Sequence, residues 1–176
     1  MARSSLSELD HCVLSVIARL QPCTAYAVRR EFQTSLTASW RASTGSIYPL
    51  LRKLVARGHV TQTEVPESAR NAKLLSLTPT GTAAVHEWLT TVSDTLAAPV
   101  ADPIRTRAHL LSSLTLEEAH SLIGRWRGAT AKTLRAVETR LDQARRDKDE
   151  METRTHRGLQ LQLEARLRWL DELGSS

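Results

Sequence analysis

The stretch Ser43–Gly58 (STGSIYPLLRKLVARG) decides how the rest of the sequence is interpreted. Its apolar residues recur at the spacing of one helical face, namely Ile47, Leu50, Leu51, Leu54 and Val55. The opposite face carries hydroxyl-bearing and cationic side chains, including Ser46, Arg52, Lys53 and Arg57. Gly58 stands where a left-handed C-terminal cap is expected. The spacing predicts a helix over this stretch, which either lies on a solvated surface or enters a DNA groove.

Positive charge is concentrated around this stretch. The 176-residue chain has a net charge of +5 and a pI of about 9.8. Residues 29–73 hold eight cations and three anions, so that the remainder of the chain is neutral. A basic region of this kind favours a polyanionic partner such as nucleic acid.

Several classes of protein are disfavoured. No apolar run is long enough to span a membrane, and the start MARSSLSELD has no signal-peptide pattern, so a cytoplasmic protein is expected. The two cysteines, Cys12 and Cys23, suit a reducing compartment, and with His11 they match no zinc spacing. The sequence has no phosphate loop and no nucleophile elbow. We therefore expect neither an enzyme nor a bound metal or cofactor.

The segments around the opening stretch supply its context. Helices are expected over Leu6–Leu20 and from Thr24 to Thr34, and Leu36–Arg41 is expected to be a connector. The segments that follow are a strand at His59–Val65, a turn at Pro66–Ala72 and a strand at Lys73–Leu77. Thr78 and Pro79 then begin a helix that is expected to run through Leu96. Three helices followed by a two-stranded hairpin is the order of a winged helix-turn-helix, whose third helix enters the major groove.

The second half of the sequence is helical. Ala97–Pro103 is a boundary, which divides the chain into a winged domain with its linker helix at 1–98 and a helical domain at 99–176. A short helix is expected at Ile104–Leu114, and Thr115 with Glu118 predicts a capping box for a long one. Two long amphipathic helices favour pairing with a second copy, although a monomeric helical domain has the same pattern. The residues expected at this dimer interface are Leu134, Val137, Leu141, Leu163, Leu167, Trp169 and Leu170.

The sequence resembles the PadR family of winged helix-turn-helix regulators, and in particular its longer-tailed members. The similarity is carried by GSIYPLLRKLVARGHV (Gly45–Val60), by Leu77–Gly81 (LTPTG) and by Trp88–Leu89. Thr24–Ala25 replaces the family's His-Gly pair before Tyr26, and Leu75 replaces a common Tyr. The resemblance implies a homodimeric repressor on a pseudo-palindromic operator, with an aromatic-lined cavity that takes a small effector.

Together, the residues and the resemblance assign a set of contacts. Pro49 is the third residue of the helix if Ser46 is its N-cap, and it bends the first turn if the helix begins at Ser43. Thr44 and Ser46 either bind phosphate or cap the helix, and Tyr48 either contacts DNA or packs on Trp40. The expected DNA contacts are Tyr26, Arg29, Arg30, Thr44, Ser46, Tyr48, Pro49, Arg52, Lys53, Arg70 and Lys73. Trp88 is either a core residue or part of a site for a small aromatic effector.

We therefore predict a DNA-binding transcription regulator, most simply a repressor that acts as a homodimer on double-stranded DNA. Two other classes remain open. One is a ligand- or metal-sensing winged-helix protein whose DNA contact is secondary, and the other is a protein–protein adaptor. An acidic third helix would favour the adaptor, whereas this one is basic.

Overall fold

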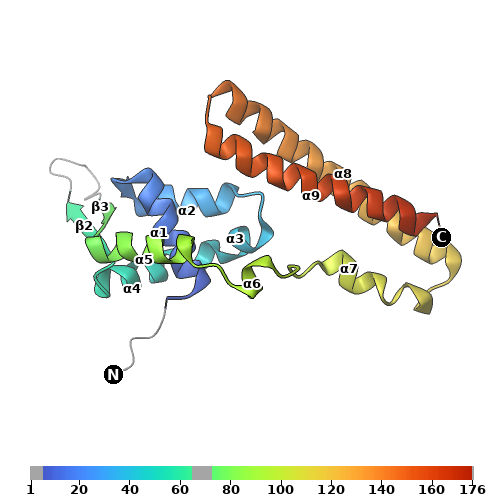
Figure 1. Cartoon of the computed structure of the whole chain (residues 1–176), viewed down its shortest axis with the longest axis horizontal. Coiled ribbons are helices and arrows are strands. Elements are labelled where there is room, and N and C mark those ends of the chain that lie inside the picture. The colour runs from blue at the N-terminus through green and yellow to red at the C-terminus, as the bar shows by residue number, and fades with distance from the viewer. Residues whose placement is uncertain (1–5, 65–72, 176) are drawn as a thin grey trace. The chain divides into compact units, whose positions relative to one another are not determined.

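The computed structural model describes residues 6–64 and 73–175 (Figure 1). It divides the chain into two compact units, Met1–Ala97 and Ala98–Ser176. Each unit has its own hydrophobic interior, and each is described by itself below. No helix within the described ranges has the length and apolar content needed to cross a membrane.

Four helices form the frame of the amino-terminal unit: α1 (Glu8–Leu20), α2 (Ala25–Thr34), α4 (Ile47–Ala56) and α5 (Pro79–Thr90). Their apolar stripes meet in one core, which includes the fully buried Leu14, Ile17, Phe32, Ile47 and Leu54. The side chains of Ser7, Thr24 and Thr78 accept backbone N–H groups and so cap the starts of α1, α2 and α5. The predicted helix order of this unit is confirmed.

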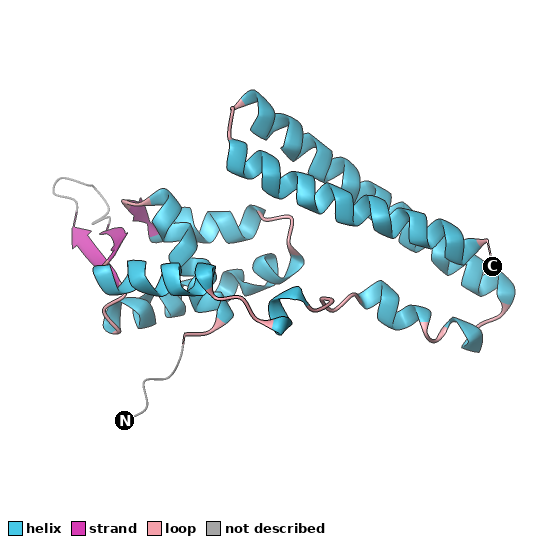
Figure 2. Ribbon diagram, in the orientation of Figure 1, coloured by secondary structure: helices cyan, strands magenta, loops and turns pink. Residues whose placement is uncertain are grey.

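The wing is part of a three-stranded antiparallel sheet (Figure 2). Strand β2 (Val60–Glu64) pairs with β3 (Lys73–Leu77), so that Gln62 lies opposite Leu75. A two-residue strand, β1 (Cys23–Thr24), pairs with the other edge of β3 and was not predicted. The sequence gives little signal for it because two residues carry no alternation. The predicted turn Pro66–Ala72, which includes Arg70, lies outside the described residues.

The stretch Ser43–Gly58 does not form the single helix that its periodicity predicts. The expected connector holds a short helix, α3 (Ala38–Ala42), and a 3-10 turn, η1 (Ser43–Ser46), follows it. The α-helical part begins only at Ile47, with Ser46 as the N-cap residue, and Gly58 adopts the expected left-handed conformation with φ of 74°. A helix over all of Ser43–Gly58 is therefore wrong at its amino-terminal end. Pro49 is the third helical residue, a position where a missing N–H costs no intrahelical bond.

The helix after the wing is shorter than expected. α5 ends at Thr90, and the chain continues into a separate short helix, α6 (Asp94–Ala97). Leu89, Val92 and Leu96, which were expected to continue the apolar stripe, are exposed. The prediction of one helix through Leu96 is therefore wrong, because these residues find no core to pack against within the amino-terminal unit.

The carboxy-terminal unit is a helical hairpin. A short helix α7 (Pro103–Ala108) and a 3-10 turn η2 (Leu111–Ser113) lead into α8 (Leu116–Arg146) and α9 (Glu150–Gly174), which lie side by side along their length (Figure 1). The predicted capping box at the start of α8 is confirmed, because Thr115 and Glu118 exchange hydrogen bonds. The buried residues of the two helices recur every seven positions, as in a coiled coil, at Ile123, Thr130, Val137, Ala144, Leu163 and Leu170.

The contact between α8 and α9 buries several residues that the sequence assigns to a dimer interface. Val137, Leu141, Leu163 and Leu170 are buried between α8 and α9 of the same chain. They therefore pack within one protomer, and a direct role in contact with a second copy does not fit their burial. The other three, Leu134, Leu167 and Trp169, remain partly exposed. The physical reason is that two long helices connected by a tight turn bury one another's stripes.

Candidate nucleic-acid interface

Helix α4 has one face in the core and one face in solvent. Ile47, Leu51 and Leu54 are buried, which fixes the rotation of the helix about its axis. The opposite side therefore presents Tyr48, Pro49 and Arg52 outward, and all three are exposed. Tyr48 is 42% exposed, while Trp40 stacks on Phe32 with ring centroids 4.5 Å apart. We call Tyr48, Pro49 and Arg52 the outward strip of α4.

The hydroxyl groups before α4 are not used as helix caps. Ser46 makes no side-chain cap hydrogen bond and is exposed. The Thr44 hydroxyl donates to the carbonyl of Arg41 at 2.7 Å, and the Ser43 hydroxyl donates to the carbonyl of Ser39 at 2.8 Å. The Ser46 hydroxyl is therefore exposed at the start of α4 and makes no helix cap, so it can donate to a phosphate.

Lys53 differs from the outward strip. Its Nζ donates to both carboxylate oxygens of Asp10, at 2.9 and 3.1 Å. Asp10 belongs to the first turn of α1, and its side chain is fully buried. The sequence places Lys53 among the DNA contacts, but this ion pair gives its charge a partner inside the protein.

The cationic residues of α2 have different exposures. Arg30 is exposed and Arg29 is half-buried. Tyr26 is 62% exposed and so is not part of the core. Tyr26, Arg29 and Arg30 are the second, fifth and sixth residues of α2, the second helix of the winged unit.

In the wing, Lys73 begins β3 opposite Glu64, and its Nζ lies 3.7 Å from the Glu64 carboxylate. Both side chains are well exposed, so this contact contributes little to stability and leaves Lys73 accessible. Arg70, the other expected wing contact, is outside the described residues.

The base of the wing is tightly packed around Gly81. The Thr78 N–H donates to the His59 carbonyl at 3.0 Å, and the Thr78 hydroxyl donates to the Gly58 carbonyl at 2.6 Å. A Cβ at Gly81 would lie 2.1 Å from the His59 carbonyl oxygen. This close approach explains why the Leu77–Gly81 stretch carries a glycine. It also packs the start of α5 against Gly58 and His59, which follow α4.

Trp88 lies on α5 against the first turn of α1. Its Nε1 donates to the Glu8 carboxylate at 3.0 Å, and its ring stacks on His11 with a centroid distance of 5.6 Å and an interplanar angle of 3°. Trp88 is also partly buried against the core of its own unit. The structure thus gives Trp88 packing partners, and a role in effector binding remains a prediction.

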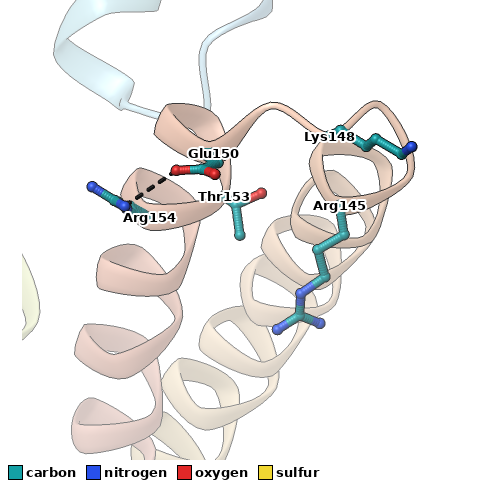
Figure 3. Close-up of a pocket in the computed structure, with 5 residues that line it drawn as sticks. All are labelled: Arg145, Lys148, Glu150, Thr153 and Arg154. Carbon is teal, nitrogen blue, oxygen red and sulfur yellow. Dashed lines mark hydrogen bonds and ion pairs between the residues drawn. The ribbon is translucent and has the colours of Figure 1, made fainter.

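The carboxy-terminal unit has an open hollow where α8 turns into α9. It is lined by Arg145, Lys148, Glu150, Thr153 and Arg154 (Figure 3). Arg154 pairs with Glu150, and Arg145 pairs with Asp142. The lining is polar, without an aromatic ring, and does not suit a small aromatic molecule. The described residues contain no cluster of three or more His, Cys, Asp or Glu side chains that could hold a metal ion.

Comparison with known proteins shows a similarity to a family of transcriptional regulators. A model described as the Transcriptional regulator PadR-like family matches residues 13–87, which extend from α1 to α5. The part of the chain from α1 to α5 is therefore similar to PadR-like transcriptional regulators. The proteins that this model describes are transcriptional regulators, which agrees with the expectation of a regulator.

Similar proteins of known structure agree in fold with this chain. The curated Negative transcriptional regulator PadR of Bacillus subtilis is 28% identical over 115 residues, which cover 65% of this chain but only 62% of the relative. The crystal structure of B. subtilis PadR in complex with operator DNA has a TM-score of 0.84 at 20% identity, with 98% of both chains covered. The Vibrio cholerae virulence activator AphA has a TM-score of 0.73 at 22% identity, with 96% of both chains covered. These structural similarities establish the mainly α-helical winged fold with carboxy-terminal helices.

Sequence reasoning missed one feature of this interface. The ion pair between Asp10 and Lys53 joins residues 43 positions apart in the sequence. Asp10 is visible in the sequence as the third residue of a capping box with Ser7, and that role explains it without a second partner. The need for a cation such as Lys53 follows from the burial of the Asp10 carboxylate, because a buried charge must be paired. This burial is not visible in the sequence.

Proposed function

We propose that this PadR-like chain is a sequence-specific DNA-binding repressor that acts as a homodimer on a pseudo-palindromic operator. The observation that supports it best is the outward strip of α4, Tyr48, Pro49 and Arg52, held away from the core by Ile47, Leu51 and Leu54. A tyrosine hydroxyl and a guanidinium one helical turn apart suit base edges and phosphates in the major groove. The B. subtilis PadR structure with operator DNA supports the same interpretation.

The remaining contacts are assigned to the DNA backbone. Ser46 and Thr44, at the start of α4, and Arg29 and Arg30 of α2 suit phosphate binding, and Tyr26 is exposed beside them on α2. In the wing, Lys73 and Arg70 are assigned to backbone or minor groove. We leave Lys53 out of this proposed set because its ammonium group donates to both carboxylate oxygens of Asp10.

We assign DNA binding to residues 1–98 and homodimerisation to the helical domain at residues 99–176. The support is its exposed apolar side chains, which include Leu110 at 67% and Leu116 at 72% exposure, and the partly exposed Leu134, Leu167 and Trp169. An apolar surface of this kind is typical of a protein interface. Dimerisation would bring two outward strips to successive half-sites one or two helical turns apart.

A small-molecule effector is proposed to release the operator. One support is the B. subtilis PadR structure in complex with p-coumaric acid. The other is Trp88 of α5, whose aromatic ring packs against the first turn of α1. The protein has a DNA-bound and a DNA-free arrangement. A compound that binds one of them more tightly than the other would shift the equilibrium between them. A cytoplasmic location is proposed together with this function, and the two free, buried cysteines suit a reducing compartment.

The substitution Arg52→Ala tests the proposed function. On DNA selected from the protein's own promoter region, we expect the affinity to fall by about tenfold or more and the salt slope to shrink by about one charge if Arg52 binds phosphate. The matched control is Arg57→Ala, at the exposed C-terminal end of the same helix, for which we expect a smaller effect. Unchanged affinity and unchanged salt slope for Arg52→Ala would show that this face of α4 does not contact DNA.

A further inference from the structure

Asp10 is the most completely buried charged group of the amino-terminal unit, as far as the structure describes it. Its side chain has no solvent exposure. The carboxylate accepts the Ser7 N–H at 2.8 Å, the Ser7 hydroxyl at 2.9 Å and the Lys53 ammonium at 2.9 and 3.1 Å. A buried carboxylate is stable only when it is paired and hydrogen-bonded, so Asp10 depends on Lys53.

The partner of Asp10 comes from the middle of α4, directly after Arg52. The other contacts of α4 are made by apolar side chains, which tolerate a small slide or rotation of the helix. A hydrogen-bonded ion pair is directional and tolerates much less. The Asp10–Lys53 pair therefore adds a fixed point to the flank of α4, beside the outward strip.

The first turn of α1 is itself well anchored, so it provides a rigid reference for α4. Ser7 and Asp10 form the capping box of this turn. Glu8 accepts the Trp88 N–H, and His11 stacks on the Trp88 ring. One helical turn therefore contacts α5 through Glu8 and His11, and α4 through Asp10.

We propose that Asp10 and Lys53 are positioning residues for DNA recognition: their ion pair holds α4 so that the outward strip meets the operator. This inference rests on the proposed DNA-binding function. It gives Lys53 a role through Asp10 and not through a phosphate of the DNA. It also gives a function to Asp10, a residue that solvent and DNA do not reach.

The two possible roles of Lys53 predict opposite effects for Asp10→Asn. If Lys53 were a phosphate contact, removing the Asp10 charge would free its ammonium group and would maintain or strengthen DNA binding. If the pair positions α4, the same substitution weakens binding. Lys53→Met gives a second distinction, because loss of a phosphate contact lowers the salt slope by about one charge whereas loss of a positioning contact does not.

The experiment measures operator affinity over a series of salt concentrations for the full-length protein and three variants: Asp10→Asn, Lys53→Met and the double variant. We expect each single substitution to lower operator affinity by about tenfold with an unchanged salt slope. We expect the double variant to match the single ones, because residues in one ion pair are not additive. Lys132→Met, which removes an exposed lysine from α8 of the other unit, is the matched control and should bind like the parent.

A readout that separates positioning from loss of folded protein is the affinity for non-operator DNA. Partial unfolding lowers the active fraction and weakens binding to both DNAs equally, whereas a displaced α4 weakens operator binding and leaves non-operator binding near the parent value. If a single variant fails to fold, the double variant remains informative, because it leaves no unpaired buried charge. Circular dichroism and the thermal midpoint establish that each variant is folded before its affinity is measured.

The outcomes are distinguishable. A parent protein that binds selected DNA no more tightly than random DNA would overturn the proposed function, and this inference with it. A selective parent with Asp10→Asn binding as tightly as the parent would overturn the positioning role alone. The same conclusion follows if Lys53→Met lowers the salt slope, or if the folded double variant keeps full operator affinity.

Discussion

Arg52 and Lys53 are adjacent cations on one helix, and their surroundings give them different roles. Arg52 follows Tyr48 by one helical turn and is exposed on the side opposite the core. Lys53 is rotated by about 100° from it, as successive helical residues are, and reaches Asp10. The sequence shows the two charges but not the carboxylate that distinguishes them.

Gly81 is a second position where one residue determines local structure. Because Gly81 has no Cβ, the His59 carbonyl oxygen can lie close to its backbone. A Cβ at this position would be 2.1 Å from that oxygen and would clash with it. We expect Gly81→Ala to lower the free energy of unfolding by about 2 kcal/mol, because backbone atoms on both sides must move. Urea denaturation measures this loss.

The control for Gly81→Ala is Gly45→Ala, because a Cβ at Gly45 would have nothing within 4 Å. We expect its free energy of unfolding to stay within about 0.5 kcal/mol of the parent. Equal stability of the Gly81 and Gly45 variants would contradict the packing described for the base of the wing.

At the scale of elements, the helices and the paired strands could be predicted because their signals are local. Thr24, Thr78 and the Thr115–Glu118 pair identify three helix starts by capping chemistry alone. The strand β1 and the helix α3 were missed, because β1 exists only through its pairing with β3 and α3 has five residues. Of the candidate site, the outward strip followed from periodicity, whereas the roles of Lys53 and of the α8–α9 seam depend on contacts between distant segments.

Asp102 joins two elements of the carboxy-terminal unit. It caps α7 through the Ile104 and Arg105 amides, and it accepts the Arg166 guanidinium of α9 at 2.7 and 3.1 Å. Burial raises the pKa of Asp102, but the two amides and Arg166 together lower it by more than burial raises it. The pKa therefore lies below its ordinary value. The carboxylate therefore stabilises the fold above its unfolded-state pKa, and this contribution is lost as the pH falls through the folded-state pKa.

We expect Asp102→Asn, which keeps a capping side chain but loses the charge, to lower the free energy of unfolding by about 1 kcal/mol at pH 7. The difference from the parent should shrink as the pH falls below the unfolded-state pKa of about 4, and it should disappear below the lowered folded-state pKa, where the folded parent carboxylate is also protonated. Denaturation at several pH values measures it, with the exposed Asp142→Asn as the control. A difference that persists at low pH would contradict the role of the charge.

As a whole molecule, the proposed repressor needs two copies of the chain to bind two half-sites. The exposed Leu110 and Leu116 of the Ala98–Ser176 unit are the surface that we assign to the partner. Sedimentation should give a dimer for the full chain and a monomer for a chain that ends at Ala98. A stable dimer of the shortened chain would place the interface in the amino-terminal unit instead.

The central claim is that two copies of α4 recognise DNA at two related half-sites. Selection of bound fragments from genomic DNA by the full-length protein, beginning with its own promoter, tests this most directly. The account predicts one enriched inverted repeat with half-sites centred one or two helical turns apart, about 10 or 20 base pairs. Enrichment of a sequence without two-fold symmetry, or no enrichment over random fragments, would contradict it.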